Sequence, residues 1–449
     1  MKHVTLLRML AVAGLAVLSA APQRAAETRR LTLTEAVHLA ISQNRELKIA
    51  RLKVVEYEQK KAGARSSYFP QLTNQSNALH VTELQNVGIS AGALGSVEGL
   101  PVPAQNINIP QGQNRLFSSG TMVSQPTTQL IRIRQANLMA AADVAVSRDD
   151  VKKAENQVAL QVHNLYFGIL IARLQRQAAE QQNAYSEEHL RESEEDVHNG
   201  SALKIATIQG QAGLLESRQA ALTAQLQIDD LTTALNDLLG LPLDTQLELD
   251  PAIPANFDSL SREEYVKTAW SQNPEILAGE EAIRKARAGV TAAKSAYIPD
   301  VTAYARHSYQ DGIPFLVHNF GEFGFHLTWD VFDFGKRRAA VRERETQLAE
   351  AEENLERLKE QVAVNIERSY NKVQRTRSLV EVANQVVKLR REGERLAGNQ
   401  LKQGAVLVSD QRQATAATYR AKADYLQASL GYLLAWAELE QAVGRTPGY

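Results

Sequence analysis

Two long stretches of the chain have the hydrophobic rhythm of coiled-coil helices. They run from about Ile131 to Gly240 and from Lys336 to Gly444 and contain no proline, the residue that costs about 3 kcal/mol inside a helix. In the second stretch the apolar positions are spaced three and four residues apart, at Leu348, Ala351, Leu355, Leu358, Val362, Ile366, Tyr370 and Val373. This spacing predicts a helix that packs along a partner of similar length.

A turn signal divides each stretch into two arms, so that each predicts a helical hairpin. The turns are Asn199-Gly200 in the first stretch and Gln403-Gly404 in the second. Arms of about 40 to 65 residues are about 60 to 100 Å long, because a helix rises 1.5 Å per residue. A helix of that length cannot wrap around an ordinary globular core.

The last arm predicts a neighbour on each of two sides. One heptad stripe comprises Tyr425, Ala428, Tyr432, Ala435, Leu439 and Ala442, and a second comprises Leu426, Leu433, Trp436 and Val443. Two adjacent seams let a helix contact two neighbours. Repeated laterally, this geometry closes into a tube of helices, although the stripes alone also fit a helix buried in a bundle.

A different period, of two, marks a predicted strand of about ten residues. Apolar Phe323, Phe325, Leu327 and Trp329 alternate there with polar or small residues. Such a strand suits a membrane β-barrel with the aromatic face toward lipid, and it also suits a soluble antiparallel sheet. Residues 72–81 and 114–124 alternate poorly. Between them, residues 88–112 are rich in glycine, proline and asparagine and predict a long extracellular loop.

The chain is an internal duplication. Ser-Gln-Asn occurs at 42–44 and at 271–273, and the Tyr-Phe-Pro ending at Pro70 matches the Tyr-Ile-Pro ending at Pro299, all 229 residues apart. Later matches, such as Gly200 with Gly404, are 204 residues apart. Each copy predicts a first helix (34–66 and 262–295) that ends before its proline, then two strands, then the long hairpin.

Four strands in one chain cannot enclose a membrane barrel, since the smallest such barrels have about eight. A bilayer also excludes open sheet edges. We therefore expect the chain to oligomerise. Two copies would supply eight strands and three copies twelve, and only the wider ring leaves a water-filled lumen.

The N-terminus predicts a secretory signal peptide. Lys2, His3 and Arg8 precede an apolar run that ends in small residues at 19–21, and this run is too short to cross a bilayer. The predicted organisation is a signal peptide at 1–26, a first repeat at 27–240, a linker at 241–261, a second repeat at 262–444 and a tail at 445–449.

Composition narrows the function. Lysine plus arginine number 50 against 51 acidic residues, which gives no reason to expect a nucleic-acid partner, and the absence of cysteine excludes disulfides and thiolate chemistry. Ser201-Ala-Leu-Lys204 has an acyl-enzyme spacing without its partner motifs. The acidic run from Glu192 to Asp196 is interpreted as a solvated helix face. We expect no catalytic, metal or cofactor site.

Together, these features resemble the outer-membrane efflux proteins typified by TolC. The resemblance depends on the duplication, the Leu-Thr-Leu-Thr-Glu-Ala opening at 31–36, the junctions at Pro70 and Pro299, the Asp-Val-Phe-Asp-Phe-Gly segment at 330–335 and the two turn glycines. It implies a mainly α-helical homotrimer with a membrane β part, a twelve-stranded barrel with four strands per chain that continues into a periplasmic α-helical barrel. The linker at 241–261 would belong to a belt around the tube.

The resemblance also implies a gate at the periplasmic tip, where the family has an aspartate six residues after a glycine. Gly404 and Asp410 match this pattern, so three Asp410 carboxylates would form an acidic ring. The corresponding position in the first copy is Ala206. Gln413 stands where TolC has a second aspartate, and Gln209 is its counterpart in the first copy. The charged latch of the archetype is not reproduced.

The implied function is a passive exit duct in the outer membrane of a Gram-negative-type cell, extending into the periplasm. Its partners would be outer-membrane lipid, an inner-membrane pump that supplies the energy, and a periplasmic adaptor. The adaptor would dock at the turns Asn199-Gly200 and Gln403-Gly404. A soluble, exported coiled-coil scaffold is the alternative. The sequence does not reveal the cargo.

Overall fold

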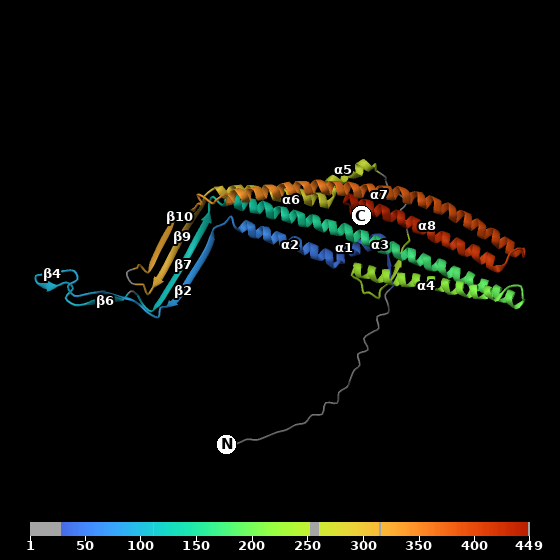
Figure 1. Cartoon of the computed structure of the whole chain (residues 1–449), viewed down its shortest axis with the longest axis horizontal. Helices are drawn as coiled ribbons and strands as arrows, with labels where there is room; N and C mark the ends of the chain where they lie inside the picture. Colours follow the sequence, from blue (N-terminus) through green and yellow to red (C-terminus); the bar gives the residue numbers. More distant parts are fainter. Residues whose placement is uncertain (1–27, 111, 252–259, 314–315, 448–449) are drawn as a thin grey trace, which may run out of the picture. The chain divides into compact units, whose positions relative to one another are not determined.

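The structure is a computed structural model that describes residues 28–110, 112–251, 260–313 and 316–447. The predicted signal peptide lies outside the described residues, as do residues 252–259 of the predicted linker and residues 448–449 of the predicted tail. The order of elements is helices, strands and a long helical hairpin, followed by the same series again (Figure 1).

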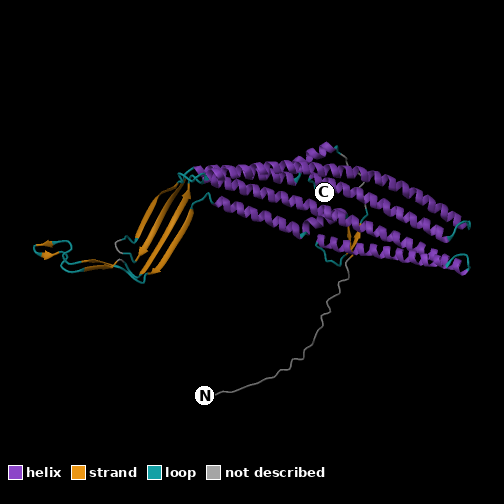
Figure 2. Cartoon of the chain, in the orientation of Figure 1, coloured by secondary structure: helices purple, strands orange, loops and turns teal. Residues whose placement is uncertain are grey.

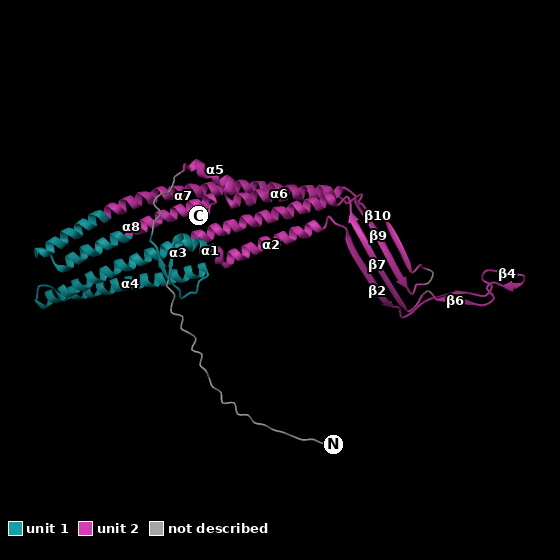
Figure 3. Ribbon diagram, turned by 180° about the vertical axis from the view of Figure 1, so that it is seen from behind, with its two compact units in different colours: residues 1–40, 162–253, 387–423 teal, residues 41–161, 254–386, 424–449 magenta. Residues whose placement is uncertain are grey.

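The described chain divides into two compact units (Figure 3). Unit 1 comprises Met1–Ala40, Val162–Ile253 and Val387–Ala423, and unit 2 comprises Ile41–Gln161, Pro254–Val386 and Asp424–Tyr449. Because the long helices run through both units, the division falls within helices and not at linkers between domains.

Unit 2 contains a four-stranded antiparallel sheet with the order β10-β9-β7-β2 (Figure 2). The strands are β2 (Gln71–His80), β7 (Arg115–Pro126), β9 (Asp300–Asp311) and β10 (Asn319–Thr328). The poorly alternating segments of the first repeat are therefore strands despite their weak pattern. They are paired along their full length with β9 or with each other, which a single-strand pattern does not reveal.

Two sequence predictions about this sheet need correction. The strand β10 ends at Thr328, where its partner β9 begins at Asp300, so that Trp329 lies just beyond the paired ladder. The predicted long loop is also more ordered than expected. It includes two short ribbons, β3 (Asn86–Ile89) with β6 (Ile107–Pro110) and β4 (Ser96–Val97) with β5 (Leu100–Pro101).

The first helix of each repeat is broken, whereas the sequence predicted continuous helices over 34–66 and 262–295. Helices α1 (Leu33–Gln43) and α2 (Arg45–Ser66) are separated at Asn44, and α5 (Arg262–Gln272) and α6 (Pro274–Lys294) at Asn273. The extended ψ angles of these two asparagines, 130° and 121°, interrupt the helices.

Each break is stabilised by the asparagine that causes it. The Asn44 side chain accepts hydrogen bonds from the N–H groups of Glu46 and Leu47, and the Asn273 side chain accepts one from Glu275. Such N-caps satisfy the free donors of the new helix. Asn273 also donates to the carbonyl of Ala442, 3.0 Å away, which ties the break to the end of the long hairpin.

The long hairpins have the predicted arms. They are α3 (Leu130–His198) with α4 (Lys204–Leu239), and α7 (Lys336–Lys402) with α8 (Val408–Val443). The predicted seam of α7 is confirmed in unit 2, where Leu355, Val362, Ile366 and Val373 belong to one buried cluster. Both predicted stripes of α8 contribute to that cluster, through Ala435, Leu439, Trp436 and Val443.

In unit 1, α3 is braced against a small parallel sheet. Strand β1 (Thr28–Leu31) pairs with β8 (Gln246–Leu249). The hydroxyl of buried Tyr166 lies 3.0 Å from the carbonyl oxygen of Leu31 and 2.8 Å from that of Asp250, and donates to this pair. Burial raises the pKa of Tyr166 to about 12, so that the hydroxyl stays a donor at neutral pH.

Candidate pore and tip sites

The two hairpin turns lie at the same end of unit 1 (Figure 3). Gly200 and Gly404 have φ angles of 75° and 70°, the left-handed conformation that glycine adopts without strain. Asn199 and Gln403 precede them, as predicted for the turns. In the first turn, the Ser201 hydroxyl donates to the carbonyl of Asp196, 2.9 Å away.

Asp410 takes part in the start of α8. One of its carboxylate oxygens accepts a hydrogen bond of 3.0 Å from the N–H of Leu407, a contact that stabilises a helix N-terminus. The side chain is otherwise exposed, and so is that of Gln413 three residues later. On α4, Ala206 is half-buried and Gln209 is exposed.

A contact between the hairpins was missed in the sequence. Glu192 of α3 accepts a hydrogen bond of 2.9 Å from the N–H of Ser409 on α8. The sequence pattern indicates a solvated helix face for the acidic run from Glu192 to Asp196. Glu192 departs from that interpretation because a carboxylate at a helix N-terminus satisfies a donor that has no partner inside the helix. The run itself carried no signal that singled out one of its members.

A groove lies along the first hairpin, with a volume of about 430 Å³. Tyr185 and His189 on α3 stack on one of its walls with ring centroids 5.6 Å apart. Gly210 and Gly213 line the α4 side. At Gly210 a Cβ atom would lie 3.1 Å from the Cδ1 atom of Leu190, so this glycine allows the close approach of the two arms.

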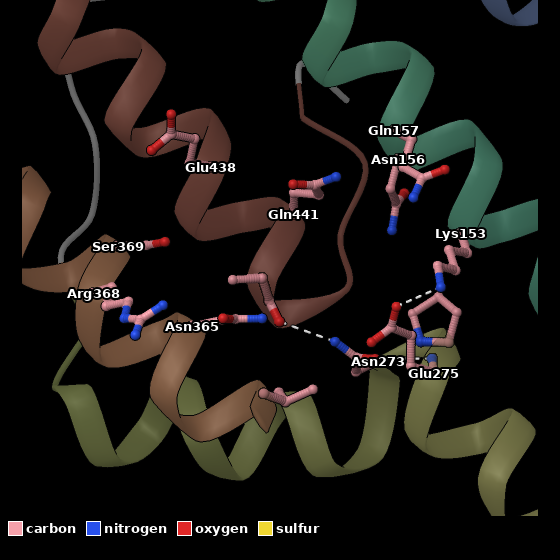
Figure 4. A pocket seen from close by; sticks show the side chains of 13 residues that line it. Lys153, Asn156, Gln157, Asn273, Glu275, Asn365, Arg368, Ser369, Glu438 and Gln441 are labelled. Carbon is pink, nitrogen blue, oxygen red and sulfur yellow. Dashed lines mark hydrogen bonds and ion pairs between the residues drawn. The ribbon is translucent and has the colours of Figure 1, made fainter. Parts of the chain in front are cut away.

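A second, polar cavity lies in unit 2 where α6 begins (Figure 4). Its volume is about 360 Å³, and helices α3, α6, α7 and α8 line it. Lys153 forms an ion pair of 2.6 Å with Glu275 at its edge. Arg368 and Gln441 extend into its opposite side (Figure 4). Asn273, where the helix breaks, is one of the residues that line this cavity.

One face of the sheet is strongly apolar at its β10 edge. Phe323, Phe325 and Leu327 are 88, 76 and 62 % exposed, and their register places Ala305, Ala303 and Val301 beside them on the same face. Trp329 is 51 % exposed just past the strand. The junction prolines stand where the chain passes from helix to strand, Pro70 directly before β2 and Pro299 directly before β9.

The described part of the chain was compared with the requirements of a membrane-spanning helix and of a metal site. Among residues 28–110, 112–251, 260–313 and 316–447, none of the helices combines the length and hydropathy needed to cross a membrane. No group of three or more histidine, aspartate or glutamate side chains in those ranges is placed to hold a metal ion.

Comparison with known proteins gives a family match for the second half of the chain. Residues 265–445 match the family model of the outer membrane efflux protein. This segment belongs to the outer membrane efflux protein family. It includes α5 to α8 together with β9 and β10, which are the elements that carry Asp410 and the aromatic strand. None of the curated proteins compared with the chain matches it.

Solved structures show that the outer membrane efflux fold extends over nearly the whole chain. The Campylobacter jejuni CmeC outer membrane channel is 16 % identical, with a TM-score of 0.73 over 92 % of this chain and 85 % of that one. VceC, an outer membrane protein from Vibrio cholerae, is 15 % identical, with a TM-score of 0.70 over 92 % and 96 %. CusC is 17 % identical, with a TM-score of 0.72 over 92 % of each chain. The fold is that of outer-membrane channels.

Proposed function

We propose that this outer membrane efflux protein is a passive exit duct, assembled from three copies in the outer membrane and extending into the periplasm. The observation that carries the proposal is the sheet of unit 2. It ends at two edges, β2 and β10, and its β10 side is covered by exposed aromatic and aliphatic residues. Hydrocarbon can solvate that surface but cannot satisfy the edges, so neighbouring copies must pair with them.

The helices provide a second argument for assembly, beginning with α4. Its buried residues, such as Ser217 and Ala224, face one way. Roughly on the opposite side, with heptad spacing, lies a set that we call the α4 seam. Its residues are Ile205, Ile208, Leu215, Leu222 and Leu226, all more than half exposed. An exposed seam of this kind needs a partner helix.

A corresponding seam lies on α7. The residues of the α7 seam are Leu379, Val382, Val386, Leu389 and Leu396, which are between 42 and 74 % exposed. They follow the same alternation of three and four, with Gly393 at the remaining position. The α4 seam of one copy and the α7 seam of the next therefore offer complementary knobs and holes.

Three copies fit these requirements better than two. Twelve strands leave a water-filled lumen, whereas a ring of about eight strands has an interior that side chains fill.

The chain offers no phosphate-cradling motif, so the energy for transport must come from a pump. We place the adaptor at the turns around Gly200 and Gly404. Asp410 and Gln413, with Ala206 and Gln209 on the first hairpin, are the gate candidates.

The first experiment is purification and reconstitution. We expect the protein to fractionate with outer membranes, to migrate as a trimer in mild detergent and to conduct ions across a planar bilayer. A monomer that shows no conductance in lipid would overturn the proposal. A protein that salt removes from membranes would support the exported scaffold instead.

The second experiment locates the adaptor. Since the chain has no cysteine, Asn199→Cys and Gln403→Cys each introduce a single reactive site. We expect both to crosslink to a periplasmic partner in intact cells. Gln227→Cys on the exposed surface of α4, away from the turns, is the control. Equal crosslinking at all three positions would contradict docking at the turns.

A further inference from the structure

The face of the sheet opposite Phe323 has a single central row that carries charge. The continuous register places Thr73, Met122, Arg306 and Glu322 side by side on β2, β7, β9 and β10, with their side chains on that face because neighbouring residues alternate. Among the described strand residues, Asp300 is the other acidic group there, and Arg132 neutralises it at 2.6 Å.

Gly120 makes room for the Arg306 side chain. A Cβ atom at this position of β7 would lie 3.0 Å from both Nε and Nη2 of Arg306. Gly120 is buried, whereas the other residues of β7 are half-buried or exposed, since the guanidinium covers it. The arginine therefore lies across the neighbouring strand and does not extend straight away from the sheet.

Glu322 neutralises this charge only weakly. The nearest approach between Nη1 of Arg306 and Oε1 of Glu322 is 3.8 Å, and the side chains are 48 and 45 % exposed. Ion pairs that are this loose and this exposed contribute about 0 to 1 kcal/mol. Each charge therefore acts on an ion that comes closer to it than to its partner, whereas at larger distances the two charges cancel.

We propose that Arg306 is a specificity-determining residue of the duct. In a closed trimer, the polar face lines the lumen and three copies of Arg306 form a basic ring at one level of the barrel, with Glu322 beside each. Each Arg306 attracts anionic groups that come close to it, such as carboxylates, phosphates and sulfates on cargo, as well as small anions, and Glu322 beside it opposes that attraction. This inference rests on the proposed function, because a lumen exists only in the closed barrel.

Ion selectivity of reconstituted channels tests the proposal. In a potassium chloride gradient at low ionic strength, we expect Arg306→Gln to lower the chloride-to-potassium permeability ratio severalfold, since one unit charge at about 4 to 8 Å in water changes the local concentration of each ion by roughly two- to fivefold, in opposite directions. Arg306→Lys should keep the wild-type ratio, and Glu322→Gln should raise it. All differences should shrink at 1 M salt, where the screening length falls to about 3 Å.

Two further variants separate charge from position. Gln75→Ala, on the same face of β2, changes no charge and should leave the ratio unchanged. Gly120→Ala keeps the charge but displaces the guanidinium, so we expect a smaller fall than with Arg306→Gln. A wild-type ratio in Gly120→Ala would overturn the role of the fixed position.

The two proposals fail in different ways. A wild-type protein that assembles but carries no current would overturn the duct. A conducting wild type whose ratio is the same in Arg306→Gln would overturn the role of Arg306 and leave the duct intact.

Discussion

The two long hairpins have nearly the same length, but they expose an apolar seam on different arms. The first arms, α3 and α7, have 69 and 67 residues, and the second arms, α4 and α8, have 36 each. In the first hairpin the second arm carries the exposed seam. In the second hairpin the first arm carries it, whereas the residues of both α8 stripes are buried or half-buried.

Contacts inside unit 1 explain the difference for the part of each hairpin nearest its turn. There α3 packs on α4 through Gly210 and Leu190, and contacts α8 through Glu192. The Thr418 hydroxyl of α8 donates to the carbonyl of Arg390 on α7. The order across this layer is therefore α4-α3-α8-α7, with two inner and two outer helices. The two repeats have diverged according to position in this layer, because only the outer helices need a partner from another copy.

The largest expected effect comes from a charge on an exposed seam. Leu222→Glu on α4 would bury an unpaired carboxylate between copies, at a cost of about 3 kcal/mol or more per interface, which is over a hundredfold in association. We expect a native gel to show monomers and circular dichroism to show the native helix content. Leu433→Glu, on a buried stripe of α8, should lose the fold as well.

The control for this comparison is Gln227→Glu, an exposed position of α4 outside the seam, which should still form trimers. If Leu222→Glu assembles as the wild type does, the α4 seam is not an interface and the contrast between inner and outer helices has another cause.

The next largest effect is expected at the two glycines that end α4 and α8, where substitution by alanine should destabilise the fold to different extents. Gly240 and Gly444 have φ angles of 68° and 102°. Gly240→Ala should cost about 1 to 2 kcal/mol from backbone strain. At Gly444 a Cβ atom would also lie 2.5 Å from the Cα of Asn273, so Gly444→Ala should cost about 3 kcal/mol or more. Thermal unfolding in one detergent measures both, and equal shifts would show that Asn273 moves away freely.

Two tyrosines at matching positions of the repeats give a smaller contrast. Tyr166→Phe removes the hydroxyl that donates to the carbonyls of Leu31 and Asp250, at a cost of about 0.5 to 1.5 kcal/mol. Tyr370 is half-buried and packs against Tyr265 with ring centroids 6.3 Å apart, so Tyr370→Phe should cost a few tenths of a kcal/mol. A larger effect at Tyr370 would reverse the comparison.

The pH dependence provides an independent check on Tyr166. Its folded pKa is raised to about 12 from 10.0, so its protonated form is favoured in the fold. The corresponding stabilisation is full below pH 10 and is lost as the pH rises toward 12. The difference in melting temperature between wild type and Tyr166→Phe should therefore shrink over that interval, and a constant difference would contradict the raised pKa.

The smallest effect is expected at the N-termini of α1 and α5, where both repeats have the same kind of hydrogen bond. Glu264 and Glu35 accept hydrogen bonds from the N–H groups and from the hydroxyls of Ser261 and Thr32, and these bonds lower the pKa of each carboxyl from 4.5. Ser261→Ala should cost at most about 1 kcal/mol. Because the folded pKa is lowered, the wild-type advantage should be full above pH 4.5 and fade in acid. Thr32→Ala should behave in the same way. If the difference in stability between wild type and variant persisted unchanged at low pH, the two carboxylates would not be its cause.

Local patterns predicted most of the elements. The spacing of Leu355, Val362 and Ile366 was enough to place a buried seam, and the matching prolines and turn glycines were enough to reveal the duplication and the hairpin turns. Helix periodicity and turn chemistry are properties of a few neighbouring residues, so they can be read from one chain. The same holds for the alternation of Phe323, Phe325 and Leu327.

The breaks at Asn44 and Asn273 and the pairing of β2 with β7 needed the tertiary structure. An asparagine inside a helical pattern is compatible with a continuous helix until its side chain finds free N–H groups. A weakly alternating strand is stabilised by partners that are far away in sequence. The sequence also could not distinguish Glu192 from its acidic neighbours, or show that Arg306 lies over Gly120.

The sequence by itself thus determined the repeating elements, their order and the likeness to the outer membrane efflux family. Only the tertiary structure decided which seams are covered within one chain and which, such as Leu222 and Leu389, remain exposed. The physical reason is that burial depends on the neighbours of a helix, and the heptad spacing of apolar residues on α8 and on α4 does not reveal whether those neighbours belong to the same chain.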